Sequence, residues 1–173
     1  MVIWITGMSG AGKTTLGNAL ARLLKPRLPH LFLIDGDVIR SLFGGDLDYS
    51  EPSRRTQIGR LQRLAQWLER QGGIAIVAAL YAHPELLEWN RANFDAYFEV
   101  YLEAPLELLR QRDSKGLYAA ASDGRIANVV GVDIPWHAPA RSDLIIDVGA
   151  GSCADAMAHQ VIAGIPRFAA LAA

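Results

Sequence analysis

Short apolar runs alternate along the chain with longer segments in which apolar residues recur at helical spacing. The runs have the length of β-strands, and several are apolar at nearly every position, which is typical of strands covered on both faces. In one longer segment the spacing of Ile58, Leu61 and Leu68 predicts an amphipathic helix. This alternation favours an α/β fold built on a parallel sheet. The predicted strands are Val2–Thr6, Leu31–Ile34, Ile74–Ala79, Tyr97–Leu102 and Asp143–Val148.

One region interrupts the alternation. Residues 112–140 are rich in Gly, Asp and Pro and show little periodicity. Ordinary connections are far shorter, and long loops of this kind often act as lids or binding loops, so we expect a lid there. No repeat or linker divides the sequence, and we expect a single domain over residues 1–173. The main predicted helices are Lys13–Lys25, Pro52–Gln71, Pro84–Phe94, Pro105–Arg112 and Cys153–Ile165.

The composition limits the classes of partner and location. Hydrophobic residues make up 51% and charged residues 20% of the chain, which excludes a disordered protein. A net charge of -1 gives no general attraction to nucleic acid or to an anionic membrane, so neither is expected as a partner. The single Cys153 excludes an internal disulfide. The apolar run Gly72–Ala82 is too short to span a membrane, and Met1–Thr6 lacks the features of a signal peptide, so we expect a cytoplasmic protein.

A glycine-rich loop follows the first predicted strand. Residues 7–14 match the P-loop pattern G-x-x-x-x-G-K-[ST] in full. Glycines let the backbone wrap around a phosphate with its N–H groups pointing inward, and the following helix adds partial positive charge. Lys13 can reach the β- and γ-phosphates, and the Thr14 hydroxyl can ligate Mg²⁺. The loop predicts a nucleoside-triphosphate site, but it does not by itself separate a kinase from other nucleotide-binding proteins.

Two carboxylates follow the second predicted strand, in the turn Asp35-Gly36-Asp37. Because the carboxyl ends of parallel strands face the ligand crevice, both would lie near the P-loop. They could help hold Mg²⁺, or orient and deprotonate an attacking hydroxyl. An ordinary Asx turn, with Asp37 capping a short helix over Val38–Phe43, explains them equally well. Arg40 lies on the same side of that helix as Asp37 and could bind an anionic substrate.

Further pieces of sequence follow these motifs in a fixed order. In order and spacing the whole set resembles a known family, the adenylylsulfate kinases, which are P-loop kinases. The resemblance runs from Ile3 to about Leu144. The pieces are Gly7–Thr15, Asp35-Gly36-Asp37 with Arg40, Leu47-Asp48-Tyr49-Ser50, Arg54–Arg60, Glu99–Glu107, Arg112–Tyr118 and Gly131–Trp136.

The resemblance implies a fold, a reaction and an ATP site. The fold would have three layers, with a five-stranded, mainly parallel sheet, helices on both faces and a lid loop. The family transfers the γ-phosphate of ATP to the ribose 3′-hydroxyl of adenylylsulfate, which activates sulfate, and its members commonly form dimers. The resemblance implies that Thr14 and Asp35 form the Mg²⁺ site. The ATP-binding residues would be Gly7, Ser9, Gly10, Ala11, Gly12, Lys13, Thr14, Thr15 and Arg112.

The resemblance also assigns the side that binds the small-molecule nucleotide acceptor. Asp37 would orient or deprotonate the 3′-hydroxyl, in a catalytic set with Lys13, Asp35 and Lys115. Tyr49 stands where the family has an aromatic ring that stacks on the base. Lys115 falls in the lid, which must exclude water if ATP is not to be hydrolysed. The predicted substrate-binding residues are Asp37, Arg40, Tyr49, Arg54, Gln57, Leu80, Lys115, Gly116, Leu117 and Val129.

Four departures from the family gather on the acceptor side. The Ser-Pro pair after the third strand aligns with Ala82-His83, and Ala82 cannot carry a phosphate, which favours direct in-line transfer. An asparagine on the long helix that contacts substrate is Gln57 here. An arginine expected soon after the Ser-Pro pair is missing, with Arg91 as a loose candidate to replace it. Val129 stands in place of the second aromatic ring of the base sandwich. Because stacking on an aromatic ring is worth ~1–3 kcal/mol per base, a purine would be held less firmly.

Three functions fit this sequence. The first is an adenylylsulfate kinase. The second is a relative that phosphorylates another activated nucleotide, such as cytidine diphosphoramidate in surface-polysaccharide modification, which would explain departures confined to the acceptor side. The third is a nucleotide-binding module without transferase activity, against which Lys13, Asp37 and the lid argue. Tyr81, His83, Trp89 and Trp136 are additions that could reshape the pocket. Packing is the alternative role of the two tryptophans, and His83 fits a surface residue as well as a ligand.

Overall fold

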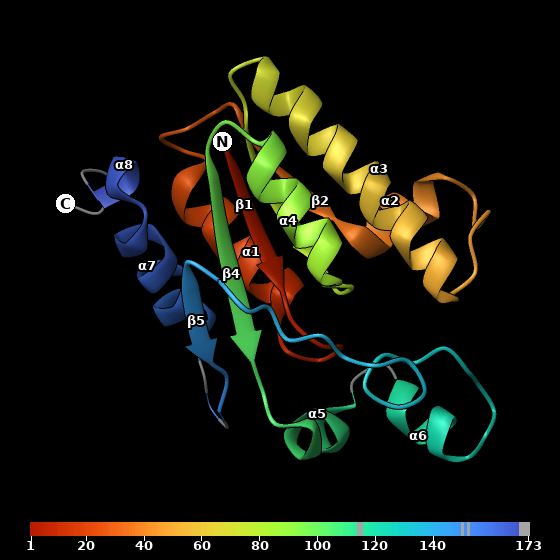
Figure 1. Ribbon diagram of the computed structural model, residues 1–173. Coiled ribbons are helices and arrows are strands. Elements are labelled where there is room, and N and C mark those ends of the chain that lie inside the picture. Colours follow the sequence, from red (N-terminus) through yellow and green to blue (C-terminus); the bar gives the residue numbers. More distant parts are fainter. Residues whose placement is uncertain (114–115, 150, 152, 170–173) are drawn as a thin grey trace.

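In the described part of the chain, residues 1–113, 116–149, 151 and 153–169, five parallel strands form one sheet (Figure 1). Helices pack on both faces of the sheet, and the strand order is β2-β3-β1-β4-β5 in this computed structural model. The predicted three-layer α/β architecture is therefore confirmed. The strands are β1 (Val2–Thr6), β2 (Leu31–Asp35), β3 (Ile74–Ala79), β4 (Tyr97–Glu103) and β5 (Leu144–Asp147).

The predicted helices are present, with ends that differ only slightly from those that the apolar spacing indicates. Two short helices, α6 and α8, were not predicted, because six and four residues are too few for helical spacing to repeat. Within the described residues, no helix is both long enough and apolar enough to cross a bilayer. The helices are α1 (Lys13–Leu24), α2 (Gly36–Leu42), α3 (Glu51–Arg70), α4 (Pro84–Asn93), α5 (Leu106–Arg112), α6 (Leu117–Ser122), α7 (Ala154–Gly164) and α8 (Pro166–Ala169).

The sheet divides the apolar interior into two layers. Along β1, Ile3 and Ile5 belong to the layer beneath α1 and α7, whereas Val2 and Trp4 belong to the layer beneath α3 and α4. This alternation follows from strand geometry, because successive side chains point to opposite faces. Every residue of β1 and β3 is buried, since both strands lie inside the sheet. The prediction of strands covered on both faces is confirmed for these two.

The carboxyl ends of the strands bring three separate segments together. Thr6 of β1 pairs with Ala79 of β3, and Asp35 of β2 pairs with Ala78. The glycine-rich loop after β1, the turn after β2 and Leu80 after β3 therefore meet at one edge of the sheet. In Figure 1 the arrowheads of β1 and β4 point toward this edge, and α5 and α6 lie beyond it. Open parallel sheets bind ligands at this edge.

The lid segment has more local order than its composition suggests. It contains α6, whose Tyr118 N–H donates to the Asp113 carboxylate at 3.1 Å. Farther along, the Asp133 carboxylate accepts the backbone N–H groups of Asn128 and Val129, each at 2.5 Å. Bonds from the backbone to short acidic side chains therefore organise the segment, and apolar periodicity does not reveal such bonds.

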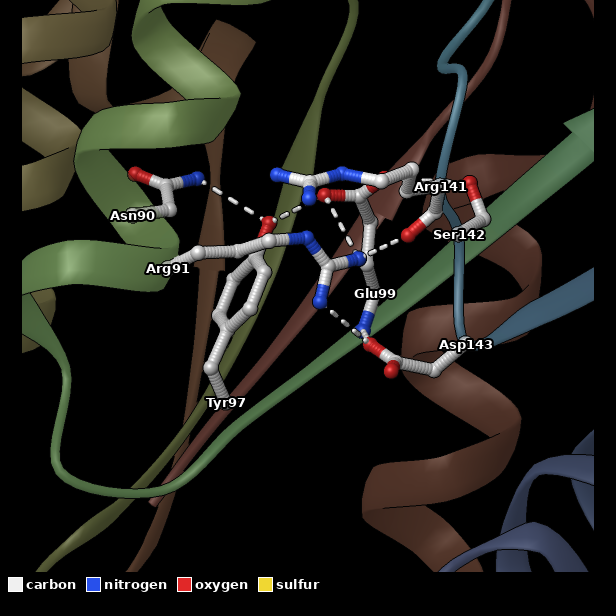
Figure 2. Close-up of polar contacts among 7 residues, drawn as sticks. All are labelled: Asn90, Arg91, Tyr97, Glu99, Arg141, Ser142 and Asp143. Carbon is white, nitrogen blue, oxygen red and sulfur yellow. Dashed lines mark hydrogen bonds and ion pairs between the residues drawn. The ribbon is translucent and has the colours of Figure 1, made fainter.

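A buried polar network fixes the chain that leads from the lid segment into β5 (Figure 2). Glu99 of β4 is 1% exposed, and its carboxylate accepts hydrogen bonds from the hydroxyls of Tyr97 at 2.8 Å and Ser142 at 3.0 Å. The Glu99 N–H donates to the Asp143 carboxylate at 2.7 Å. Arg91 of α4 lies 3.6 Å from the Glu99 carboxylate and 3.4 Å from that of Asp143. The network joins α4, β4 and the chain entering β5.

Replacing Glu99 by alanine is expected to lower the free energy of unfolding by about 3 kcal/mol. The change leaves Arg91 with one carboxylate partner in place of two and removes an acceptor shared by Tyr97 and Ser142. Urea unfolding followed by circular dichroism measures the difference. The control is Glu107→Ala at an exposed position of α5, which should change the free energy by less than about 0.5 kcal/mol. Equal effects of the two substitutions would contradict the role given to the network.

Candidate functional site

A cavity of about 960 Å³ opens at the carboxyl edge of the sheet. Its walls come from the glycine-rich loop, the turn after β2, α2, α3, the end of β3 and the lid segment. Ligand pockets commonly measure ~300–1,000 Å³, so the cavity is large enough for nucleotides. The predicted site residues that line it are Ser9, Gly10, Gly12, Lys13, Thr14, Thr15, Asp35, Asp37, Arg40, Tyr49, Arg54, Gln57, Leu80, Leu117 and Val129.

The glycine-rich loop depends on two glycines for its shape. Gly12 is the N-cap of α1 with φ +97°, a conformation that residues with a side chain rarely adopt. A Cβ on Gly7 would lie 2.8 Å from the backbone oxygen of Leu102, so the close approach to β4 requires glycine. Lys13 Nζ donates to the carbonyl oxygens of Gly7 and Met8, both at 2.8 Å. The ammonium therefore lies beside the loop and helix N-terminus, which together form a phosphate site.

One carboxylate joins the loop to the turn after β2. Asp35 Oδ2 accepts a hydrogen bond from Thr14 Oγ1 at 2.6 Å. Its Oδ1 accepts the N–H groups of Asp37 at 2.9 Å and Val38 at 3.3 Å, and so caps α2. The interpretation of Asp37 as the cap is wrong, because α2 begins at Gly36 and Asp37 lies in its first turn. Asp35 takes this role because it ends β2 with the extended backbone that an N-cap needs.

The oxygens of Thr14 and Asp35 are chemically suited to Mg²⁺. Hydroxyl and carboxylate oxygens are common ligands of this ion, which binds one or two protein carboxylates and completes its shell with water and phosphate oxygens. The 2.6 Å contact places the two candidate ligands side by side at the start of α1. Among the described residues, no three His, Cys, Asp or Glu side chains form a cluster of the kind that holds a metal. Two protein ligands are enough for an Mg²⁺ ion whose other ligands are phosphate oxygens and water.

Asp37 and Arg40 both line the cavity from α2. Residues three positions apart lie on the same side of a helix, so the carboxylate and the guanidinium share one wall. Arg40 Nη1 donates to the carbonyl oxygens of Leu47 at 3.2 Å and Asp48 at 2.8 Å. These bonds fix the cation against the loop between α2 and α3, where its charge is available to an anion.

Arg54 ties Tyr49 to the lid segment. Its Nε donates to the Tyr49 carbonyl oxygen at 2.9 Å, and its Nη2 to that of Asn128 at 2.7 Å. The guanidinium carbons of Arg40 and Arg54 lie 4.8 and 5.6 Å from the centroid of the Tyr49 ring, within cation–π range. Burial lowers the pKa of Arg54, but a guanidinium stays charged at neutral pH. This end of the cavity combines an exposed aromatic ring with two fixed cations, which suits a base and its attached phosphate.

Gln57 of α3 is 5% exposed and lines the same cavity. Its Nε2 donates to the carbonyl oxygen of Gly36 at 2.9 Å, which orients the side-chain amide. Its Oε1 is buried and has no hydrogen-bond partner among the described residues. An unpaired buried acceptor costs about 1–3 kcal/mol. A ligand that supplies an N–H or O–H donor at this point would remove that cost.

Five predicted site residues do not line the cavity or fall outside the described residues. Gly7 and Ala11 belong to the glycine-rich loop and shape it, and Ala11 is fully buried. Arg112 donates to a carbonyl oxygen in the segment after β5 at 2.7 Å, and Gly116 precedes α6 with φ +65°. Lys115 lies outside the described residues. The structure therefore gathers the loop, the acidic turn and α3, but not Arg112.

Arg91 is directed to a different part of the molecule. It lines a separate cavity of about 80 Å³ together with Glu99 and Pro139, and is bound within the network of Figure 2. Its suggested role as a replacement for the missing substrate arginine is therefore wrong. The carboxylates that bind Arg91 come from β4 and from the chain before β5. Both are distant from α4 in the sequence, so the sequence around α4 does not reveal them.

Two tyrosines outside the predicted site residues contact the site, and of these Tyr81 is one of the additions that could reshape the pocket. Tyr118 of α6 is buried, and its hydroxyl donates to the carbonyl oxygen of Ser9 at 3.0 Å, which ties the lid segment to the glycine-rich loop. Tyr81, just after β3, is 4% exposed, lines the cavity and donates to Glu51 at 2.5 Å. Two features of the sequence could have indicated these residues. Tyr118 ends the family motif Arg112–Tyr118, and Tyr81 directly follows the predicted site residue Leu80.

A family model and curated relatives match most of the chain. The model, described as adenylylsulphate kinase, matches residues 1–147. The chain belongs to the adenylylsulfate kinase family. An adenylyl-sulfate kinase of Chloroflexus aurantiacus is 38% identical over 163 residues, which cover 94% of this chain and 88% of that protein. A cytidine diphosphoramidate kinase of Campylobacter jejuni is 37% identical over 160 residues, covering 92% of this chain and 91% of that protein.

A solved structure of the family shares the fold. The APS kinase CysC of Mycobacterium tuberculosis, in complex with AMPPNP and APS, is similar to this chain with a TM-score of 0.85. The two are 32% identical, and the match covers 94% of this chain and 95% of that one. As a family member, this chain is a phosphotransferase of the P-loop kinase type.

Proposed function

We propose that the protein transfers the γ-phosphoryl group of ATP to the ribose 3′-hydroxyl of an activated nucleotide. One observation carries the proposal. A single cavity holds the glycine-rich loop with Lys13, the carboxylate of Asp37 and the two arginines around Tyr49. Phosphoryl transfer depends on positioning and charge stabilisation, so a phosphate loop, a group that accepts a proton and an anion site must share one space.

The loop side would bind ATP and Mg²⁺. Lys13 Nζ already lies over the loop, so phosphate oxygens that enter it would meet the ammonium without a large rearrangement. Thr14 and Asp35 would hold Mg²⁺, which neutralises phosphate charge when it is bound. The lid residues Arg112 and Lys115 would add positive charge when the lid closes and excludes water.

Asp37 would act on the acceptor hydroxyl. Its carboxylate would accept the proton of the 3′-hydroxyl while that oxygen bonds to the γ-phosphorus of ATP. The bond from the γ-phosphorus to the bridging oxygen breaks in the same step, and ADP leaves. Ala82 offers no hydroxyl for a covalent phosphoenzyme, so the transfer is direct. Arg40 and Arg54 would bind the phosphate-bearing 5′ end of the acceptor, with its base against Tyr49.

Two activated nucleotides are candidate acceptors. Adenylylsulfate is the first, because the family is named for it and APS is bound in the matched structure. Cytidine diphosphoramidate is the second, because the relative of that name matches this chain about as well and Val129 stands in place of an aromatic ring. Both reactions consume ATP, and we expect the protein to act in the cytoplasm. A homodimer stays a prediction.

Acceptor-dependent release of ADP tests the proposed reaction. The protein is mixed with ATP and Mg²⁺, with adenylylsulfate, with cytidine diphosphoramidate or with no acceptor. We expect at least one acceptor to raise the rate of ADP release about 100-fold above hydrolysis alone, since general-base action on the acceptor alone is worth about 100-fold or more. Tight ATP binding without turnover on any acceptor would contradict the proposal and favour a nucleotide-binding module.

Replacing Gln57 by leucine is expected to raise the KM of the acceptor about 5- to 20-fold while leaving the KM of ATP unchanged. The substitution removes the unpaired Oε1 that a donor on the acceptor would meet, an interaction worth about 1–2 kcal/mol. Steady-state kinetics with either substrate varied separates the two constants. The control is Gln66→Leu, one of the α3 residues outside the cavity lining. An unchanged acceptor KM in Gln57→Leu would show that Oε1 does not bind the acceptor.

A further inference from the structure

Tyr81 is fixed at the end of the cavity that holds Tyr49. Its hydroxyl donates to Glu51 Oε1 at 2.5 Å, and Glu51 is the first residue of α3, two positions after Tyr49. Burial, with the bond to Glu51, raises the pKa of Tyr81 to about 12, so the phenol remains protonated at neutral pH. The ring therefore lines the cavity with its hydroxyl anchored to the first residue of α3, close in sequence to Tyr49.

A second layer of side chains holds Tyr81 in this position. Arg55, one helical turn along α3, donates to Glu85 at 2.9 Å and contacts His83 Nε2 at 2.8 Å. The His83 ring lies 6.2 Å from that of Tyr81, centroid to centroid. Because Tyr81 is 4% exposed and supported from two directions, its ring is a fixed wall of the cavity.

The lid side of this end is aliphatic. Val129 is 4% exposed and lines the cavity, and the bond from Arg54 to the carbonyl oxygen of the preceding Asn128 ties this part of the lid segment to α3. Tyr49 is thus the aromatic surface open to a base, and the guanidinium groups of Arg40 and Arg54 already lie near its ring. A two-ring base would gain one aromatic contact in this space and would compete with the ring of Tyr81.

We propose that the acceptor nucleotide carries a one-ring, pyrimidine base, and that Tyr81 is the residue that selects it. This inference rests on the proposed function, because it specifies the acceptor of that same reaction. A pyrimidine needs less width than a purine, and it stacks on Tyr49 without a second aromatic partner. Stacking on an aromatic ring contributes ~1–3 kcal/mol per base to binding. The absence of a second ring therefore costs a purine more binding free energy than a pyrimidine, because the purine has the larger surface to stack.

The test compares bases with the rest of the acceptor held constant. Four acceptors are used: the 5′-phosphosulfates of adenosine and cytidine, and the 5′-diphosphoramidates of adenosine and cytidine. We expect kcat/KM to be at least about 10-fold higher for cytidine than for adenosine with either 5′ group. A preference for adenosine with both groups, or equal values, overturns the inference. Failure to phosphorylate all four acceptors, with ATP still bound, contradicts the proposed function itself.

Two variants of Tyr81 separate its ring from its hydroxyl. Tyr81→Ser should raise kcat/KM for the adenosine acceptors about 10-fold, and adding Val129→Phe should raise it further. Tyr81→Phe keeps the ring and should keep the preference for cytidine within about threefold. Loss of the preference in Tyr81→Phe would assign selection to the hydroxyl and overturn the role of the ring. ATP affinity and thermal unfolding establish that each variant is folded. The base preference of the unmodified protein tests the identity of the base independently of the variants.

Discussion

Lys13→Ala is expected to reduce kcat for phosphoryl transfer by about 1,000-fold. The ammonium lies across the glycine-rich loop, 2.8 Å from the carbonyl oxygens of Gly7 and Met8, where the β- and γ-phosphates of ATP would sit. Preorganised donors aimed at developing charge are worth about 100- to 1,000-fold each in kcat, and a full positive charge belongs at the upper end of that range. Single-turnover measurements with saturating ATP and acceptor give the rate of transfer.

The matched control for this substitution is Lys25→Ala. Lys25 is exposed at the carboxyl end of α1, the helix that Lys13 begins, so the control removes the same charge from the same helix. The control should retain at least about half of the activity, because exposed surface substitutions have small effects. If Lys13→Ala kept more than a tenth of the wild-type rate, the role of the loop as the γ-phosphate site would be wrong.

Asp37→Asn is expected to lower kcat by about 100- to 10,000-fold, the usual value of general-base catalysis. The amide keeps the shape of the side chain in the first turn of α2 but cannot take the proton of the 3′-hydroxyl. Asp35, not Asp37, caps the helix and binds Thr14, so the fold and the Mg²⁺ ligands stay in place. The Kd of ATP, measured by calorimetry in the presence of Mg²⁺, should therefore change by no more than about twofold.

Asp95→Asn provides the control for Asp37→Asn. Asp95 is exposed and lies just before β4, at the opposite edge of the sheet from the cavity. Its substitution removes the same charge far from the acceptor and should leave both kcat and ATP affinity unchanged. Full activity in Asp37→Asn would exclude it as the group that deprotonates or orients the hydroxyl. A large loss of ATP affinity would instead place it on the ATP side.

The parts of the fold that were predictable from sequence are those governed by local pattern. Strands β1 and β3 begin and end at the predicted residues, because uninterrupted apolar runs mark strands that are covered on both faces. The glycine-rich loop was predictable for a similar reason, since residues with a side chain rarely take the conformation found at Gly12 and a Cβ at Gly7 would clash with β4. In both cases the decisive information lies within a few adjacent residues.

The remaining features depend on contacts between distant residues. Two aspartates in one turn are equally able to cap a helix. Asp35 caps α2 because it ends β2 with the extended backbone that an N-cap needs. Arg91 has an ordinary helical context, and its role appears only when β4 and residues 141–143 are in place. Likewise, the sequence indicates only that Tyr81 is an addition that could reshape the pocket. Its bond to Glu51, thirty positions earlier, makes it a wall of the cavity.

The central claim is that the phosphoryl group goes from ATP to the ribose 3′-oxygen of a nucleotide acceptor. Phosphorus NMR of the product, formed from ATP, Mg²⁺ and an acceptor of either base, locates the transferred group directly. We predict a new phosphomonoester resonance coupled to the ribose H3′, in an amount equal to the ADP formed. Inorganic phosphate as the only product, or a phosphate attached at another position, would contradict the account.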